Sequence, residues 1–396
     1  MGQLMSAFAL GYLLFQIPGG WFGNRFGTRL AFALLSTLWS LCNVATAAAS
    51  ALPALLISRF SLGAFQAGLV PISAKIVSDW TPLRSRGRSS SMISASMSVG
   101  GAFAMWLTGQ LLSNGYAWRT IFAAYSMVGI CWSIVFYWYF RTSPKEHRQV
   151  NAAELNLILE PVAPTPVAQA GTPIRRVLHS TDSDSGRFLF RNMVTSFSMW
   201  GICVQAFFQA AGYVFFVTWF FAFLEYAYGI TKAEAGMLNS LPLMAVVAGS
   251  LSGGMIIDGL LKLTGNRWLS RTGTAIFALT VCSSLTMASA WTSSATQLSI
   301  VIAFGAYFSG IANPCMWSAT IDIGGRQTAL VMGVMNMAGC LAMIILPTLL
   351  GNWFNQIRTA GGNWNLVIYL HAGFYFIAAL SWLAVNPNRN VGSRIS

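Results

Sequence analysis

The stretch GQLMSAFALGYLLFQIPGGWFGN, residues 2–24, returns in outline as GMLNSLPLMAVVAGSLSGGMIID, residues 236–258. Glycine, leucine and serine recur at its start, and a glycine pair followed by a polar residue recurs at its end, all at one offset. The matched positions are Gly2 and Gly236, Leu4 and Leu238, Ser6 and Ser240, Gly19 and Gly253, Gly20 and Gly254, and Asn24 and Asp258. A chain of two homologous halves is the simplest explanation.

Two further landmarks occur in both halves in the same order. Pro71 precedes Asp79, and Pro314 precedes Asp322, with seven residues between the members of each pair. In the next hydrophobic run of each half, residues 97–104 resemble residues 335–342. The order of these landmarks supports the internal repeat.

Composition indicates the class of protein. Of 396 residues, 55% are hydrophobic and only 8% are charged, and the mean hydropathy is +0.60, as expected for a polytopic membrane protein. One span needs roughly 20 mostly apolar residues. We therefore predict an all-α fold of about eleven transmembrane helices, at residues 1–22, 30–50, 53–77, 89–112, 118–140, 194–224, 232–261, 271–290, 295–321, 328–352 and 364–385.

Lysine and arginine predict the orientation of these helices, because positive residues favour cytoplasmic connections. They concentrate in alternate connections, beginning with the one that holds Arg25 and Arg29. This alternation puts Met1 outside the cell and the C-terminus in the cytoplasm. The span at 232–261 follows another span, whereas its repeat mate at 1–22 opens the sequence, so we expect one further N-terminal helix, twelve in all.

The domain prediction follows from the repeat. Residues 1–140 form an N-terminal bundle without its first helix, residues 141–192 a polar, proline-containing cytoplasmic linker, and residues 193–396 a six-helix C-terminal bundle. The two bundles are expected to be related by pseudo-symmetry. We expect the protein to be a monomer in the membrane.

Other functional classes receive little support. The net charge of +13 follows the topology and forms no basic face with interleaved aromatic residues, so no nucleic-acid partner is expected. Six cysteines lie singly in hydrophobic spans, which disfavours disulfides and metal sites. No cofactor, metal site or enzymatic activity is predicted, because no carboxylate pair or metal-ligand spacing accompanies the three histidines.

Arg59 is the ionisable residue of greatest interest, since the ten acidic residues fall in loops, in the linker or near span ends. His371 is a weaker case. An arginine near the bilayer centre costs about 2.5–3.5 kcal/mol and usually faces a bundle interior or a water-filled cavity. Arg59 could pair with backbone carbonyls, with an acid on the further helix, or with a substrate anion that its guanidinium binds bidentately.

The stretch from Ser6 to Gly27 resembles the second helix and following loop of major facilitator superfamily carriers. It is most similar to their anion:cation symporter family, which carries sugar acids and other carboxylates. Further landmarks of that family match the segments 59–67, 80–88, 143–147, 218–220, 229–236 and 335–339. The resemblance covers nearly the whole chain.

This resemblance implies a secondary active transporter of a small organic anion, in which two six-helix bundles rock around a central site. It places Tyr12, Arg59, Gln66, Trp317 and Asn336 at the substrate. Each also has a structural reading, as a packing or interface aromatic or as an interhelical hydrogen-bonding residue. Four weaker cavity candidates are Gln205, Gln209, Tyr213 and Asn313, and a conformational loop motif comprises Gly20, Asn24, Arg25, Gly27 and Asp258.

Three positions depart from the family pattern. Gln66 stands where proton-coupled members carry a glutamate, and an amide cannot carry a proton, so proton coupling through this position is doubtful. Met97 replaces a polar glutamine of the sugar-acid carriers, which disfavours a highly hydroxylated substrate. Asn24 replaces the usual acid of the glycine-rich loop, which weakens that loop's predicted role in locking helix ends.

Several alternatives stay open at this stage. A non-transporting membrane receptor or inactive remnant would bind an anion without moving it. A drug exporter of the same superfamily would recognise a cation, against which Arg59 argues. The exact substrate, the direction of transport, and the choice between a proton and a sodium ion for coupling are not encoded in any pattern we recognise. The expected location is the inner (plasma) membrane, with the lipid bilayer as a partner.

Overall fold

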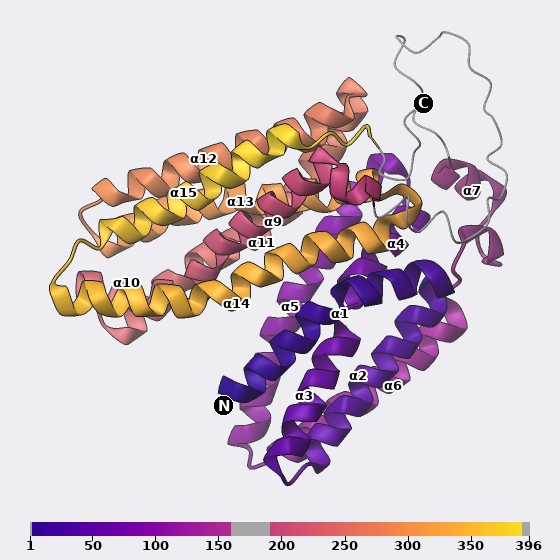
Figure 1. Ribbon diagram of the computed structural model, residues 1–396, viewed down its shortest axis with the longest axis horizontal. Helices are drawn as coiled ribbons and strands as arrows, with labels where there is room; N and C mark the ends of the chain where they lie inside the picture. Colours follow the sequence, from indigo (N-terminus) through magenta and orange to yellow (C-terminus); the bar gives the residue numbers. More distant parts are fainter. Residues whose placement is uncertain (1, 160–190, 390–396) are drawn as a thin grey trace.

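The computed structural model describes residues 2–159 and 191–389, and all regular structure within these ranges is helical (Figure 1). The N-terminal helices are α1 (Gly2–Phe26), α2 (Thr28–Ala48), α3 (Leu52–Gln66), α4 (Leu69–Trp80), α5 (Arg86–Ser113), α6 (Trp118–Tyr139) and the short α7 (Ala152–Leu159). The C-terminal helices are α9 (Phe197–Val214), α10 (Phe220–Tyr228), α11 (Lys232–Thr264), α12 (Thr274–Ala288), α13 (Ala295–Gly324), α14 (Thr328–Ala360) and α15 (Asn365–Ser381).

Local sequence explains where several helices begin and end. The side chains of Ser196, Thr231 and Ser294 accept hydrogen bonds from backbone amides three residues later, and so cap α9, α11 and α13. Glycine in the left-handed conformation follows the last residue of three helices, at Gly229, Gly265 and Gly361. These signals place helix ends within a few residues of the predicted loops.

The number of membrane spans is only partly settled. Eight helical segments in the described ranges are long and apolar enough to cross a membrane, and one of them, residues 295–360, contains both α13 and α14. The helices α1 and α5 are not among the eight. The multi-pass helical architecture is therefore established, whereas the count of eleven stays a prediction.

Two of the predicted spans are interrupted. Between α3 and α4 the helix breaks at residues 67–68, and Pro71 lacks the N–H that would bond the carbonyl of Ala67. Between α9 and α10 the five residues Phe215–Trp219 form a wider, π-helical turn. Such turns are often found at functional sites.

The helices form two groups that meet at one end and separate toward the other (Figure 1). The N-terminal half comprises α1–α6 and the C-terminal half α9–α15. They touch through α14 against α1 and α4, and through α5 against α11 and α13. We call the end near α7 and residues 141–159 the linker side, and the opposite end the far side.

The glycine pairs of the repeat make equivalent contacts. A Cβ on Gly19 would overlap Gly68 of the same half, and one on Gly253 would overlap Ile311 of its own half. The second glycine of each pair faces the other half, Gly20 against Ala329 and Gly254 against Gly87 and Ser91. Small residues thus let the backbones of the two halves approach closely at the linker side.

Among the described residues, one pair of glycines related by the repeat has different surroundings in the two halves. Gly339 of α14 lies 3.5 Å from the carbonyl of Ala206 on α9, measured from an added Cβ, whereas its repeat mate Gly101 on α5 has nothing within 4 Å. The outer part of α5 is exposed along most of its length. The further helix expected from the sequence would lie there, and it stays a prediction.

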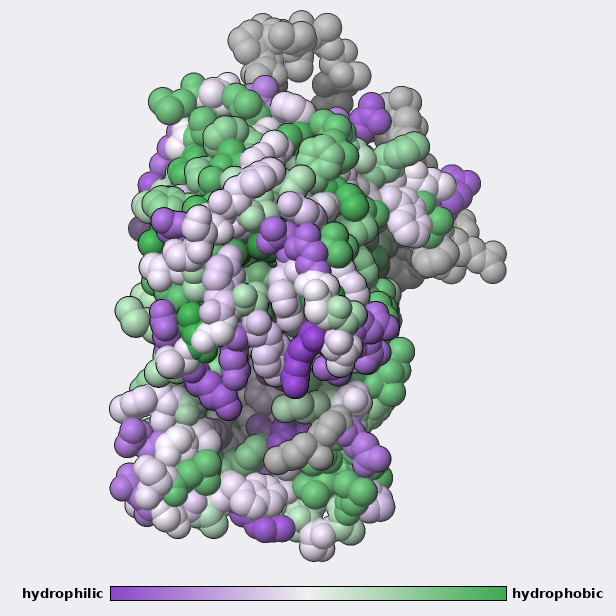
Figure 2. Space-filling view, turned by 90° about the vertical axis from the view of Figure 1, so that its left-hand side faces the viewer, coloured by the Kyte–Doolittle hydropathy of each residue, from purple (hydrophilic) through white to green (hydrophobic). Residues whose placement is uncertain are grey.

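The domain boundaries predicted at residues 140 and 192 also stay predictions, because most of the linker lies outside the described residues. Its described part includes α7. Figure 2 shows the molecule from the side on which the two halves separate, with hydrophilic residues gathered across the middle of this face and hydrophobic residues along its margins.

Candidate functional site

A polar cluster joins the two halves between α1 and α14. The amide nitrogen of Asn336 donates to Oε1 of Gln16 at 2.9 Å, and Nε2 of Gln16 lies 3.6 Å from Sγ of Cys340. The hydroxyl of Tyr12 lies near the side chains of Gln16 and Asn336. Two predicted site residues, Tyr12 and Asn336, are therefore brought together, with Gln16 fully buried between them.

Gln16 and Cys340 were missed by the sequence reasoning. Gln16 follows Tyr12 by four residues and so shares its helix face, which was a usable signal. Cys340 follows Asn336 by four residues along α14, just as Gln16 follows Tyr12 along α1. It completes the cluster.

Trp317 of α13 faces the N-terminal half. It is 6% exposed and lines a cavity of about 450 Å³ together with residues of α2, α4, α5 and α6. Most of the lining is apolar, and it includes Met97, one of the departures from the family pattern. The role of Trp317 at a substrate stays a prediction.

Three of the weaker candidates form a second polar group inside the C-terminal half. Gln205 and Gln209 of α9 hydrogen-bond each other, and Nε2 of Gln209 donates to Oδ1 of Asn313 on α13 at 2.9 Å and to the carbonyl of Ser309 at 3.1 Å. Both glutamines are buried, whereas Asn313 is partly exposed. Tyr213, one turn after Gln209, is 37% exposed and does not join this group.

Arg59 stands apart from both polar groups. Its guanidinium carbon lies 5.0 Å from the ring centroid of Phe122 on α6, a cation–π contact. The side chain is half-buried, and the ion pairs of the described residues include none to it. Gln66, two turns later on the same face of α3, is also half-buried.

Depth along the helices separates Arg59 from the other candidates. At 1.5 Å per residue, Arg59 is about 31 Å from the linker-side end of its helix pair, whereas Asn313 is about 16 Å from the linker-side end of α13. Measured along its own helix pair, Arg59 is therefore farther from the linker-side end than Asn313 is along α13.

The predicted loop motif lies at the linker side, where the halves meet. Asp258 accepts hydrogen bonds from the backbone amides of Gly87 and Arg88, at 2.9 and 2.8 Å, and so caps α5 of the other half. Its repeat mate Asn24 donates to the side chain of Gln327, at the start of α14, at 2.9 Å. One contact is ionic and its counterpart is neutral.

The remaining motif residues shape the loop itself. Arg25 lies in the last turn of α1, where a positive charge interacts favourably with the helix dipole. Gly27 adopts a φ of +84° immediately before α2, a conformation that favours glycine. Gly20 packs against the backbone of α14.

A buried ionic network at the linker side was not predicted. Arg86 of α5 donates to Asp322 of α13 at 2.7 Å and to the carbonyl of Ser78 at 3.2 Å. Arg271 lies 3.5 Å from Asp322 and 3.8 Å from Asp258, and its side chain is fully buried. Arg271 was not singled out from the sequence, because its two acidic partners are distant along the chain.

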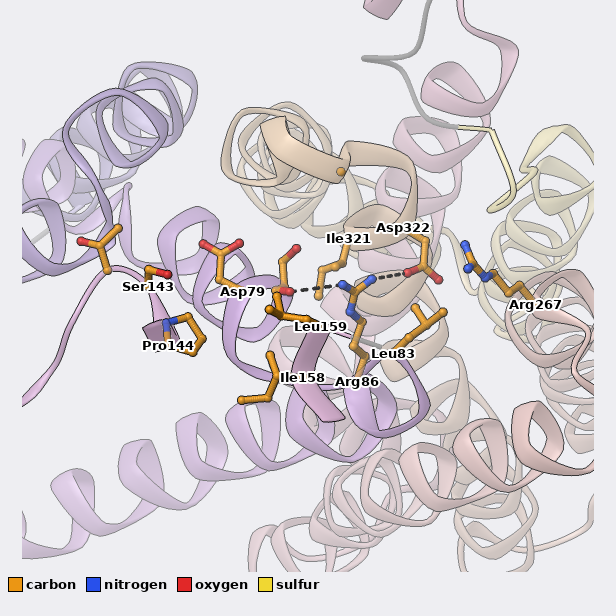
Figure 3. Close-up of a pocket in the computed structure, with 13 residues that line it drawn as sticks. Asp79, Leu83, Arg86, Ser143, Pro144, Ile158, Leu159, Arg267, Ile321 and Asp322 are labelled. Carbon is orange, nitrogen blue, oxygen red and sulfur yellow. Dashed lines mark hydrogen bonds and ion pairs between the residues drawn. The ribbon is translucent and has the colours of Figure 1, made fainter. Parts of the chain in front are cut away.

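This network forms one wall of a cavity of about 630 Å³ (Figure 3). The opposite walls include Asp79, Ser143 and Pro144, and the end of α7 contributes Ile158 and Leu159. Arg86 spans the boundary between the halves and reaches Asp322 across it. The linker side is thus closed by ionic and hydrogen-bonded contacts between the halves.

His371, the other ionisable residue noted in a predicted span, is fully buried away from these sites. Its Nδ1 lies 2.6 Å from the carbonyl of Val367, and its ring stacks 4.1 Å from that of Phe215. Within the described ranges no group of three or more histidine, cysteine or acidic residues is placed to hold a metal ion.

Two overlapping matches to the model of the Major Facilitator Superfamily cover residues 1–347 and 211–395. The chain belongs to this superfamily. Its members in the comparison are transporters rather than enzymes, and this chain is accordingly a multi-pass membrane transporter.

The similar curated proteins are named as carriers of organic acids. The probable sulfoacetate transporter SauU of Cupriavidus necator is 28% identical, over 99% of this chain and 86% of that protein. The probable galactarate/D-glucarate transporter GudP of Bacillus subtilis is 27% identical, over 99% and 84%. The D-galactonate transporter of Escherichia coli is 27% identical, over 99% and 88%.

Solved structures support the same fold. The proton:xylose symporter XylE has a TM-score of 0.71 at 17% identity, over 99% of this chain and 87% of that chain. The human organic anion transporter MFSD10 has a TM-score of 0.64 at 17% identity, over 97% and 83%. At this level of identity the likeness concerns the fold alone.

Proposed function

We propose that this transporter moves a small organic anion, a carboxylate or sugar acid, across the plasma membrane by alternating access, and that Arg59 binds the carboxylate. The names of three similar proteins support this class of cargo, since sulfoacetate, galactarate, D-glucarate and D-galactonate are all organic acids. The C-terminus would lie in the cytoplasm with the linker side.

The state of Arg59 is the observation that carries the proposal. Its guanidinium is half-buried within α3, rests on the ring of Phe122 and has no acidic partner in the described part of the chain. Such a cation is costly in the membrane unless another group balances its charge. A carboxylate cargo would supply that countercharge through bidentate hydrogen bonds.

The depth of Arg59 suggests an order of events. The anion would meet Arg59 first, from the far side, and then move toward Tyr12, Asn336 and Trp317. Opening of the linker side would require the contacts of Arg86 and Asp258 to break. Because Gln66 carries no titratable group, coupling to protons would have to use another residue, and sodium is the alternative coupling ion.

Uptake by the full chain in liposomes tests the proposal, with labelled sulfoacetate and D-galactonate as probes. Arg59→Ala should weaken the apparent affinity on the order of 30-fold, as expected when one partner of a buried charge pair is removed. Arg119→Ala is the matched control, because Arg119 also forms a cation–π contact, with Trp118 at 4.4 Å, but is exposed on α6.

The outcomes separate the alternatives. Saturable uptake whose apparent affinity Arg59→Ala weakens and Arg119→Ala leaves unchanged supports an anion carrier. Binding of an anion without uptake would favour the receptor or remnant, and recognition of organic cations would favour a drug exporter. Equal affinity in wild type and Arg59→Ala would remove Arg59 from the site.

A further inference from the structure

The side-chain amides of Gln205, Gln209 and Asn313 form a hydrogen-bonded group. The surrounding atoms determine which way each amide points. A backbone carbonyl only accepts hydrogen bonds, so the atom of Gln209 that lies 3.1 Å from the carbonyl of Ser309 must be its NH₂ nitrogen. If the amide were turned around, its oxygen would face the carbonyl oxygen of Ser309, and neither could donate a hydrogen bond.

The orientation of the Gln209 amide then determines the orientation of the amides of Gln205 and Asn313. The oxygen of Gln209 faces Gln205, which must present its NH₂ group. The same NH₂ group of Gln209 faces Asn313 at 2.9 Å, so Asn313 must present its oxygen. Gln209 thereby uses both of its N–H groups, and the amide of Asn313 is held with its own NH₂ group pointing away.

The NH₂ group of Asn313 donates no hydrogen bond within the described part of the chain, and the side chain is partly exposed. Asn313 precedes Trp317 by one helical turn and so shares its face of α13. Trp317 lines the cavity of about 450 Å³ that reaches α4 and α5 of the other half. Asn313 therefore lies on the face of α13 that Trp317 turns toward the other half.

The other end of the group is closed. Oε1 of Gln205 is buried without a hydrogen-bond partner, although burial of an unpaired oxygen is costly. All three amides belong to α9 and α13, so the group stays intact when the halves move as rigid bodies. The group therefore holds the NH₂ group of Asn313 in a fixed position within the C-terminal half.

We propose that Asn313 is a specificity-determining residue that admits cargo carrying a hydrogen-bond acceptor, such as a second carboxylate, and rejects cargo carrying an ammonium group at that place. Gln209 is the positioning residue that fixes the direction of its amide. This inference rests on the proposed function only in taking the cargo to be an organic anion. It concerns α13 of the C-terminal half, whereas Arg59 lies on α3 of the other half.

Sulfoacetate and taurine form a suitable pair of probes. Both are short sulfonates, but sulfoacetate carries a carboxylate at its other end and taurine carries an ammonium group. Competition against labelled D-galactonate, in liposomes that contain the full chain, gives the ratio of their apparent affinities. The wild type should prefer sulfoacetate over taurine by about tenfold or more, the value of a hydrogen bond to a charged group.

Asn313→Asp replaces the donor by a negatively charged acceptor. It should shift the ratio toward taurine by at least about tenfold, whereas Asn313→Leu should weaken sulfoacetate without improving taurine. Gln209→Leu should reduce the ratio because the amide of Asn313 loses its fixed orientation. The matched control Asn355→Asp lies exposed on α14 and should leave the ratio unchanged.

Failure of this inference differs from failure of the proposed function. If D-galactonate uptake depends on Arg59 but the ratio is the same in wild type and in both Asn313 variants, the role of Asn313 is refuted alone. A wild type that prefers taurine also refutes it. If the wild type takes up no organic anion at all, both proposals fall.

Discussion

At the scale of single residues, Gln66 offers the sharpest test of coupling. It lies two turns after Arg59 on α3, half-buried, and its amide binds no proton. Gln66→Glu would place at this half-buried position a carboxyl group that can bind and release a proton. Uptake should then depend more steeply on external pH than uptake by the wild type. Gln297→Glu, exposed at the start of α13, is the control, and an equal pH dependence in all three proteins would contradict this account.

Single residues also mark the limit of prediction from sequence. Tyr12 and Asn336 were placed at the site by the resemblance to the family, and the structure brings both close to Gln16. Arg271 was not recognised, because its position among loop arginines conceals partners at Asp258 and Asp322. Local patterns cannot show contacts between helices that are distant in sequence, although internal repeats recover some of them.

At the scale of elements, Gly254 tests how closely α11 must approach α5. A Cβ there would overlap Ser91 and the carbonyl of Gly87, both in the other half. Overpacking typically costs about 1–3 kcal/mol, so Gly254→Val should loosen the linker side and speed hydrogen exchange in residues 83–91. Gly259→Ala on the same helix meets no atom within 4 Å and should stabilise α11 by up to about 1 kcal/mol. Unchanged exchange in Gly254→Val would show that this approach is not needed for closure.

A neighbouring glycine supplies a contrast within the same element. Gly253 faces Ile311 of its own half, so Gly253→Val should lower the melting temperature of the protein rather than separate the halves. Thermal unfolding and hydrogen exchange together distinguish the two effects. A similar loss of stability in both variants, with no selective change in residues 83–91, would mean that the two glycines play the same role.

The elements themselves were predictable to different degrees. Hydropathy located most helices, and the offset between the glycine pairs predicted the equivalence of α1 and α11. The breaks were not predicted. Pro71 was noted only as a repeat landmark, although it interrupts the helix near Ala67, and the π-helical turn at Phe215–Trp219 leaves no signal in hydropathy.

At the scale of the whole molecule, the two halves close the linker side with unequal contacts. Asp258 caps the start of α5 with a charged group, whereas Asn24 reaches α14 through a neutral amide pair. The repeat that relates Met97 to Met335 also relates Gly87 and Arg88 to Gly325 and Arg326. A carboxylate at position 24 could therefore accept hydrogen bonds from the amides of those two residues, as Asp258 does across the interface.

Asn24→Asp should consequently strengthen closure, because a negative charge near a helix N-terminus is favourable. Both contacts close one interface between rigid halves, so exchange should slow by about fivefold in residues 83–91 as well as near the start of α14. Asp258→Asn should speed exchange in both places. Glu234→Gln, exposed at the far end of α11, is the control. If each variant alters exchange only at its own contact, the halves do not open as single bodies, and alternating access by rigid rocking would be the wrong description of this protein.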